Sequence, residues 1–207
     1  MEVLHDWCCA VLTAPLHPLL PGLSLERLTG WRTELEFWLP ARSVSSHCLD
    51  TLICQYEPLP GIRAELAPRT LAGMLKGYID LVIEHDGRFY VIDWKSNHLG
   101  DTLEAYDQAA MVASVVSHRY DVQYVIYTLA LHRHLKSRLS DYDYDQHLGG
   151  VLYLFLRGMT AEGGRGVLYR KPARELIEQL DQLLSEGERA SKARRFERER
   201  AGAGEMS

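Results

Sequence analysis

The sequence has little cysteine and lacks a long apolar run. Its four cysteines, Cys8, Cys9, Cys48 and Cys54, show neither CxxC spacing nor the density of a disulfide scaffold, so we expect reduced thiols. The apolar runs fall short of the roughly 20 residues that span a bilayer. The N-terminal segment also lacks the basic and then apolar order of a signal peptide. These absences predict a cytoplasmic protein without a membrane segment.

Two further absences exclude whole classes of activity. No GxxxxGK[ST] phosphate-binding loop occurs, which excludes an ATP-driven motor within this sequence. The formal net charge of −5 argues against a broad surface that coats nucleic acid, although a local basic groove is compatible with it. There is no internal repeat, and 46% of the residues are hydrophobic, enough for one full core. We predict one domain over residues 1–186 and a charged, disordered tail over 187–207.

The apolar pattern predicts a mixture of helices and strands, typical of an α/β or α+β fold. Strands are expected over residues 33–39, on both sides of residues 85–88, and over 149–158. Helices are expected over residues 1–14, 45–56, 101–118, 122–139 and 175–184. Asp101, with Glu104 three positions on, has the spacing of a helix N-cap and its partner. Residues 141–147 are polar and loop-like.

The segment Gly77–Asn97, GYIDLVIEHDGRFYVIDWKSN, organises the rest of the chain. Asp86-Gly87 between two runs of strand-forming residues predicts a two-residue hairpin turn. With that turn, Asp80 faces Asp93 across the hairpin. Directly opposed Cβ atoms lie roughly 4.5 to 5.5 Å apart, and like charges there are destabilising unless something neutralises them. A divalent cation would do so.

The alternation of side chains along a strand adds a third charged group to this pair. Lys95 lies on the same face as Asp93, and Trp94 lies on the opposite face. The alternative without a functional role is that Asp80 and Asp93 are unrelated polar residues on a solvated face, and that Lys95 is an ordinary edge-strand lysine. The deduced register favours convergence of two carboxylates and one ammonium group on one small area.

The motifs and their order resemble a known nuclease superfamily. Asp80 followed 13 residues later by Asp-Trp-Lys is similar to the PD-(D/E)XK signature. LKGYIDLV, YVIDWKSNHLG, YDVQYVIYTLALHRHL and DYDYDQHLGGVLYLFLRG resemble the C-terminal nuclease domains of RecB-type helicase-nucleases (exodeoxyribonuclease V). The resemblance runs from about Trp7 to about Leu184. It implies a restriction-endonuclease-like mixed sheet flanked by helices, and Mg²⁺-dependent cleavage of DNA.

The resemblance also implies a role for each matching residue of the hairpin. Asp80 and Asp93 would be metal ligands, joined by the backbone carbonyl of Trp94. The metal would be Mg²⁺, with Mn²⁺ or Ca²⁺ as alternative occupants. Lys95 would orient the attacking water and stabilise the charge that develops on the phosphate. Glu34 takes the place of the family's upstream acidic residue, with a merely solvated role as the alternative.

Gln123 and Tyr127 lie four residues apart on one predicted helix and match the QxxxY motif of RecB-like nucleases. The resemblance implies that they support the site and contact DNA. The alternative is a helix-surface pair that contributes a few tenths of a kcal/mol to stability.

One part of the family pattern is missing from the sequence. The motif GTxxHxxxE, whose histidine is an additional metal ligand, does not occur, and His5 lies in a segment that resembles a later helix of the family. We therefore expect an N-terminally truncated fragment of a RecB-type chain. As a nuclease it would act on single-stranded DNA with RecC, RecD and the RecB helicase portion, in recombinational repair of double-strand breaks. As a catalytically weak or inactive remnant it would be a binding module for RecC or RecA.

Overall fold

A five-stranded mixed sheet forms the centre of the molecule. The structure, a computed structural model, describes residues 2–18, 20–41, 44–71 and 73–186. The strand order is β1-β4-β5-β6-β7. The strands are β1 (Gly30–Pro40), β4 (Met74–His85), β5 (Arg88–Lys95), β6 (Leu148–Phe155) and β7 (Val167–Arg170). Only β5 and β6 are parallel among these neighbouring pairs. The predicted tail, 187–207, lies outside the described residues.

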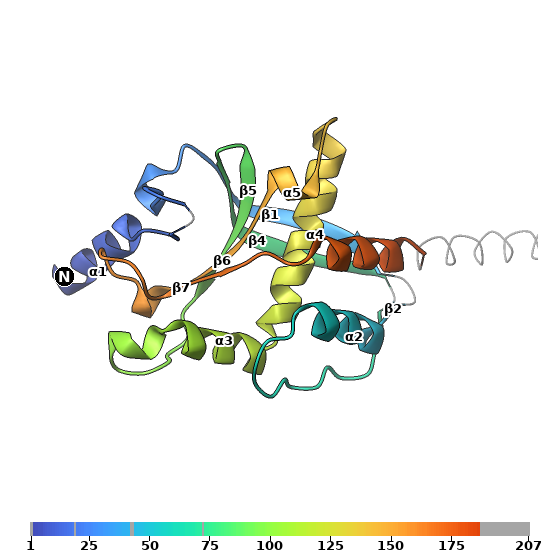
Figure 1. Cartoon of the computed structure of the whole chain (residues 1–207), viewed down its shortest axis with the longest axis horizontal. Helices are drawn as coiled ribbons and strands as arrows, with labels where there is room; N and C mark the ends of the chain where they lie inside the picture. The colour runs from blue at the N-terminus through green and yellow to red at the C-terminus, as the bar shows by residue number, and fades with distance from the viewer. Residues whose placement is uncertain (1, 19, 42–43, 72, 187–207) are drawn as a thin grey trace, which may run out of the picture.

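Helices cover one face of this sheet. They are α2 (Ser46–Tyr56), α3 (Gln108–Ser117), α4 (Tyr120–Arg138) and a helix over residues 174–186. Figure 1 shows α4 crossing the sheet, with α2 and α3 near its first turns. Ile53, Met111 and Leu129 from these helices join one buried cluster with Val82 and Val91 of the sheet. The larger part of the core therefore lies on this face.

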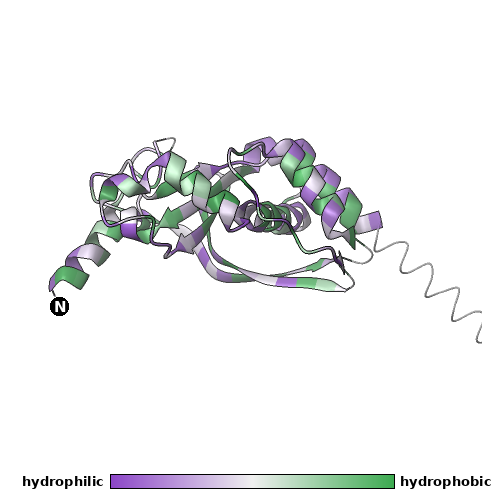
Figure 2. Ribbon diagram, turned by 90° about the horizontal axis from the view of Figure 1, so that it is seen from below, coloured by the Kyte–Doolittle hydropathy of each residue, from purple (hydrophilic) through white to green (hydrophobic). Residues whose placement is uncertain are grey.

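The N-terminal segment covers part of the other face. Leu16, Leu20 and Leu23 follow α1 (Glu2–Thr13) and pack in a second cluster with Ile83 and Ile92 of the sheet. Figure 2 shows α1 itself projecting from the body of the molecule. Its two cysteines, Cys8 and Cys9, are free and exposed.

The remaining elements are short. They are a two-stranded sheet of β2 (Val44–Ser45) and β3 (Thr70–Leu71), the helix α5 (Tyr144–His147), and three 3-10 turns, η1 (Leu25–Arg27), η2 (Leu103–Tyr106) and η3 (Leu156–Gly158). Among the described helices, none has the length and apolar character needed to cross a membrane.

The predicted mixed α/β fold is confirmed, and so are most of its elements. The turn at Asp86 and Gly87 forms with positive φ angles of 49° and 72°, as a type I′ turn requires. The predicted helix over 45–56 begins one residue later, because the Ser45 side chain caps it by accepting a hydrogen bond from the backbone N–H of His47.

Other predictions are wrong in detail. The helix after the hairpin is not capped by Asp101, because residues 103–106 form a 3-10 turn and Asp107 caps α3 through the backbone N–H of Ala110. The segment over 141–147 holds the short helix α5 rather than a loop alone. The short strand β7 was not predicted, since its four residues give little periodic signal.

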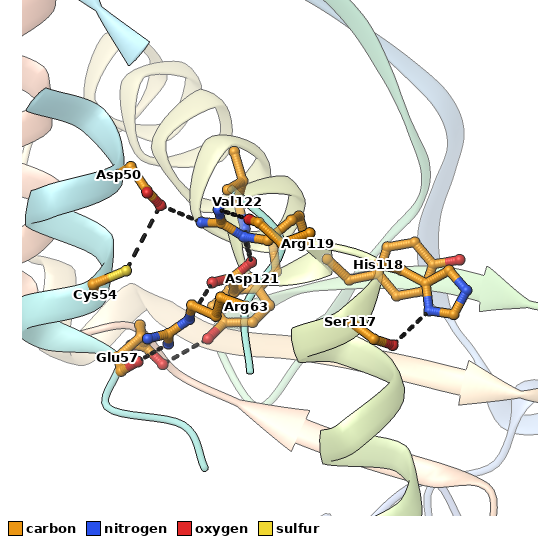
Figure 3. Close-up of polar contacts among 12 residues, drawn as sticks. Asp50, Cys54, Glu57, Arg63, Ser117, His118, Arg119, Asp121 and Val122 are labelled. Atoms are coloured by element: carbon orange, nitrogen blue, oxygen red, sulfur yellow. Dashed lines mark hydrogen bonds and ion pairs between the residues drawn. The ribbon is translucent and has the colours of Figure 1, made fainter. Parts of the chain in front are cut away.

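A buried ionic network, which we call the corner network, fixes the start of α4 (Figure 3). Arg119 joins α3 to α4 in the left-handed conformation, with φ 56°. Its guanidinium contacts Asp50 of α2 and donates to Asp121 at 3.1 Å and to the carbonyl of Ala64 at 2.8 Å. Arg63 donates to the other oxygen of Asp121 at 3.0 Å. These bonds set the direction in which α4 crosses the sheet.

Candidate active site

β4 and β5 separate at the two aspartates of the hairpin. The strands pair regularly from the turn as far as Leu81 and Ile92. Beyond that point β4 continues to pair with β1, whereas β5 continues to pair with β6. Asp80 and Asp93 therefore lie at a notch where the two strands part.

The predicted direct opposition of these aspartates is not what the structure has. Regular pairing stops one residue before them, and the Asp80 carboxylate instead accepts a hydrogen bond from the backbone N–H of Trp94 at 3.1 Å. A side-chain oxygen of β4 thus contacts the backbone of β5 where the regular pairing of the two strands has ended. The two carboxylates are near enough for the charge of Asp80 to contribute to the raised pKa of Asp93, after the larger effect of burial.

β1 places Glu34 across from Asp80. The residues on either side of Glu34 pair with the residues on either side of Asp80. Glu34 itself is exposed and has a positive φ of 49°, a conformation that costs a residue other than glycine about 1–3 kcal/mol. Three acidic residues therefore follow one line across β1, β4 and β5, and strain is concentrated at the first of them.

Asp93 and Lys95 form a buried cluster with α4, which we call the site cluster. The side chains of Asp93 and Lys95 contact each other as an ion pair, and the two residues are only 2% and 5% exposed. The Gln123 side chain links both of them, because its oxygen accepts from Lys95 Nζ at 2.7 Å and its amide donates to Asp93 at 3.1 Å. The same amide donates to the Tyr127 hydroxyl at 3.0 Å. Both residues of the QxxxY motif are therefore joined to Asp93 and Lys95 through hydrogen bonds.

Two aromatic rings enclose the ammonium group of Lys95. Nζ lies 3.8 Å from the ring centroid of Tyr120 and 4.4 Å from that of Tyr153. Such cation–π contacts are strongest where water is excluded. The hydroxyl of Tyr153 donates to the backbone carbonyl of Tyr120 at 2.8 Å. The lysine is therefore held in one position by a carboxylate, an amide and two rings.

Burial raises the pKa of the Asp93 carboxyl group in this cluster. Burial is the largest influence on Asp93 and raises its pKa above the ordinary value of 3.8, with a further rise from the charge of Asp80, while the hydrogen bond and charge of Lys95 act in the opposite direction. Burial also raises the pKa of Tyr127 and of Tyr153. The rise at Asp93 indicates that one ammonium does not fully compensate for the loss of water around this carboxylate.

The donor set of the notch fits a hard divalent cation. Asp80 and Asp93 offer carboxylate oxygens, and the backbone carbonyl of Trp94 lies between Asp93 and Lys95 in the chain. Mg²⁺ prefers oxygen ligands and keeps several waters, so one or two carboxylates are enough for it. No group of three or more His, Cys, Asp or Glu side chains placed to hold a metal occurs in the described part of the chain. The donors therefore suit a metal whose remaining ligands are water and phosphate.

Comparison with known proteins shows the family of this chain. The profile of the PD-(D/E)XK nuclease superfamily matches residues 26–203. The chain therefore belongs to the PD-(D/E)XK nuclease superfamily. It is similar to the RecBCD enzyme subunit RecB of Haemophilus influenzae, at 52% identity over 183 residues, and to that of Escherichia coli K12, at 46% identity over 187 residues. These matches cover 87% and 88% of this chain but only 15% and 16% of the two relatives.

The sequence did not predict the aromatic enclosure of Lys95. Tyr120 lies three residues before Gln123, and therefore on the same side of α4, which is a weak signal for a role in the site. Tyr153 belongs to the continuously apolar strand β6, where every residue is buried and no alternation marks one face. Its position beside Asp93 follows from the parallel pairing of β5 with β6.

Proposed function

We propose that this chain is a metal-dependent nuclease that hydrolyses phosphodiester bonds of single-stranded DNA delivered by a helicase. The observation that carries the proposal is the convergence of Asp80, Asp93 and Lys95 at one notch of the sheet. The similarity to RecB subunits supports a role in recombinational repair of double-strand breaks. On that basis we also propose association with a RecB helicase portion and with RecC and RecD, and Mg²⁺ as the metal, with Mn²⁺ or Ca²⁺ able to occupy the site.

The residues of the site have separable tasks in this reaction. Asp80, Asp93 and the carbonyl of Trp94 would hold the metal, which when bound polarises phosphate oxygen and lowers the pKa of water. Lys95 would orient the attacking water and stabilise the negative charge that develops on the phosphate. Gln123 holds the lysine in place by accepting from Nζ.

Glu34 and Tyr127 would act at the borders of this site. Glu34 lies across β4 from the notch and is exposed, so its carboxylate is available to the metal's water shell or to the substrate. Tyr127 would support Gln123 through their hydrogen bond. Because Gln123 and Tyr127 lie on a helix rather than a loop, they would keep this arrangement as substrate enters.

Cleavage of a labelled single-stranded oligonucleotide in Mg²⁺ tests the proposal. Asp80→Ala, Asp93→Ala and Lys95→Ala should each lower the cleavage rate by at least about 1,000-fold, and chelation of the metal should abolish cleavage by the wild type. Asp141→Ala, in an exposed turn, is the matched control and should cleave at the wild-type rate. Cleavage by Asp93→Ala at the wild-type rate would overturn the assignment.

A second candidate function is a binding module for RecC or RecA with weak or no catalysis. The projecting helix α1 favours it, because Val3, Leu4 and Leu12 are 83%, 63% and 47% exposed there, and exposed apolar groups of this kind mark protein contacts. Calorimetric titration with Mg²⁺ and Mn²⁺ separates the two functions. Metal binding with cleavage supports the nuclease, whereas a folded protein that binds neither metal supports the binding module.

A further inference from the structure

Exposed aromatic rings lie on the sheet face opposite α4, beside the notch. Leu39 and Ile79 point into the helix-covered core, and Asp93 points to Gln123 of α4. Their sequence neighbours therefore point to the opposite face, because side chains alternate along a strand. These neighbours, which we call the aromatic platform, are Trp38 of β1, Tyr78 of β4 and Trp94 of β5, which are 54%, 47% and 37% exposed.

A lysine and a glutamate organise the outer part of the platform. The pairing of β1 with β4 sets Trp38 beside Lys76 and Glu36 beside Tyr78. Lys76 Nζ lies 4.7 Å from the ring centroid of Trp38 and 5.3 Å from that of Tyr78. Glu36 accepts from the Trp38 indole N–H at 2.7 Å and pairs with Lys76 at 2.9 Å. The Trp38 ring is thus fixed in orientation, although none of these side chains is buried.

The platform lies near the notch along the strands, on the sheet face opposite the Asp93 side chain. Tyr78 lies two residues before Asp80, a span of about 7 Å along a strand. Trp94 lies between Asp93 and Lys95 in the chain and points away from them. A base resting on either ring is therefore about one or two nucleotides from a phosphate at the notch, given the roughly 3.4 Å between stacked nucleotides.

We propose that Trp38 and Tyr78 stack on the bases of single-stranded DNA, and that Lys76 binds its backbone, so that the aromatic platform guides the strand to the notch. This inference rests on the proposed function and adds binding residues to it. Stacking on aromatic rings tolerates any base, since every base has a π-face. Duplex DNA does not use the platform, because its bases are already stacked on one another. Lys76 is 42% exposed at its side chain, so its ammonium group is free to turn from Glu36 to a phosphate.

Binding of a fluorescent single-stranded oligothymidylate, measured by anisotropy in a chelating buffer that prevents cleavage, tests the platform. Trp38→Ala and Tyr78→Ala should each weaken binding about 10-fold, within the range that loss of one stacked base gives. Trp31→Ala is the matched control, because Trp31 lies on the same strand, is 61% exposed and is seven residues from Trp38. It should bind within about twofold of the wild type. Circular dichroism melting confirms that each variant is folded.

Two further probes separate stacking from charge. An abasic oligonucleotide of the same length, and a duplex, should each bind the wild type at least about 10-fold more weakly than the single strand. Lys76→Gln should reduce the slope of log affinity against log salt by about 0.7, the value for one phosphate contact on a single strand.

Each outcome decides between the proposals. Wild-type affinity in both Trp38→Ala and Tyr78→Ala overturns the platform, and loss of cleavage in Asp93→Ala would leave the nuclease assignment intact. The platform proposal is also overturned if Trp31→Ala loses as much affinity for single-stranded DNA as Trp38→Ala and Tyr78→Ala do. It is overturned as well if the abasic strand binds the wild type as tightly as the intact strand. If the wild type binds through Trp38 and Tyr78 but does not cut DNA in Mg²⁺, the platform stands and the nuclease assignment falls.

Discussion

The buried carboxylates of Asp121 and Asp93 differ in the number and charge of their hydrogen-bond partners. Asp121 in the corner network is fully buried, and its oxygens accept from Arg63 at 3.0 Å, from Arg119 at 3.1 Å and from the backbone N–H of Val122 at 3.0 Å. Asp93 in the site cluster is equally buried but has one ammonium partner and one amide donor. Burial raises the pKa of Asp93 despite these partners.

The number of charged partners distinguishes the corner network, which has a structural role, from the site cluster, which has groups suited to catalysis. Two guanidinium groups and a backbone N–H leave Asp121 little capacity for another partner, as expected of a group that fixes a helix corner. Asp93 lies at a notch, beside Asp80, with capacity for a further cation. Buried charge by itself therefore does not mark a site. A better indicator of a functional site is a buried charge whose partners compensate only in part for the loss of water around it.

The largest stability effect is expected in the corner network. Asp121→Ala leaves two arginines partly buried without their shared carboxylate, and removal of one partner from such a group typically costs about 3–5 kcal/mol. We expect urea denaturation to show a fall of that size in the free energy of unfolding. The control Asp141→Ala, at an exposed position, should change it by less than about 0.5 kcal/mol. A loss at Asp121 as small as at the control would show that the network is not structural.

The site cluster should behave differently when both partners are replaced. Asp93→Asn leaves the Lys95 ammonium buried without its counter-charge, and we expect a loss of about 2–3 kcal/mol in unfolding free energy. The double variant Asp93→Asn, Lys95→Met removes both charges and should recover most of that loss, because no buried charge is then left without its partner. A double variant as unstable as the single one would mean that the pair itself stabilises the fold.

Packing behind the site should give a smaller effect. A methyl group added at Gly77 would lie 2.5 Å from the ring of Phe37, and that ring packs edge-on against Tyr127 at 5.7 Å between centroids. Gly77→Ala should therefore cost about 1–3 kcal/mol and slow cleavage by displacing Tyr127. Adding Phe37→Leu to the Gly77→Ala variant should restore part of the lost stability and part of the lost cleavage rate. The control Gly30→Ala should be tolerated, because its methyl group would meet Glu84 at an ordinary 3.4 Å.

The smallest expected effect is a pH dependence from His132, a buried group outside both clusters. Burial lowers its pKa below the ordinary 6.5, while the charges of Asp181 and Lys136 act in opposite directions. The unfolded chain then takes up the proton more readily, so the stabilising contribution is complete above pH 6.5 and is lost as the pH falls through the folded pKa. His132→Gln should flatten the stability profile below pH 6.5, and the exposed His47→Gln should not. Parallel profiles for His132→Gln and wild type would contradict this.

Local rules were enough to predict the hairpin and its turn, although they wrongly placed Asp80 directly opposite Asp93. The Asp86-Gly87 turn and the period of two fix the register, so Asp80, Asp93 and Lys95 could be placed near one another without any tertiary information. The helix over 45–56 was predictable for the same reason, since its cap is the adjacent Ser45.

The notch itself could not be predicted from these rules. β4 and β5 part there while β4 stays paired with β1 and β5 stays paired with β6, and such pairings join residues far apart in the chain. The same limit applies to Tyr153, which reaches Lys95 only through the pairing of β6 with β5. The left-handed turn at Arg119 depends likewise on Asp50 and on the carbonyl of Ala64, both distant in the sequence.

Cleavage by the double variant Asp93→Asn, Lys95→Met is the most direct test of the claim that the site cluster serves chemistry rather than folding. The measurement is the rate of Mg²⁺-dependent cleavage of a single-stranded oligonucleotide, beside a urea denaturation of the same preparation. We predict a protein with near wild-type unfolding free energy and no metal-dependent cleavage. Cleavage at the wild-type rate by this folded variant would contradict the account.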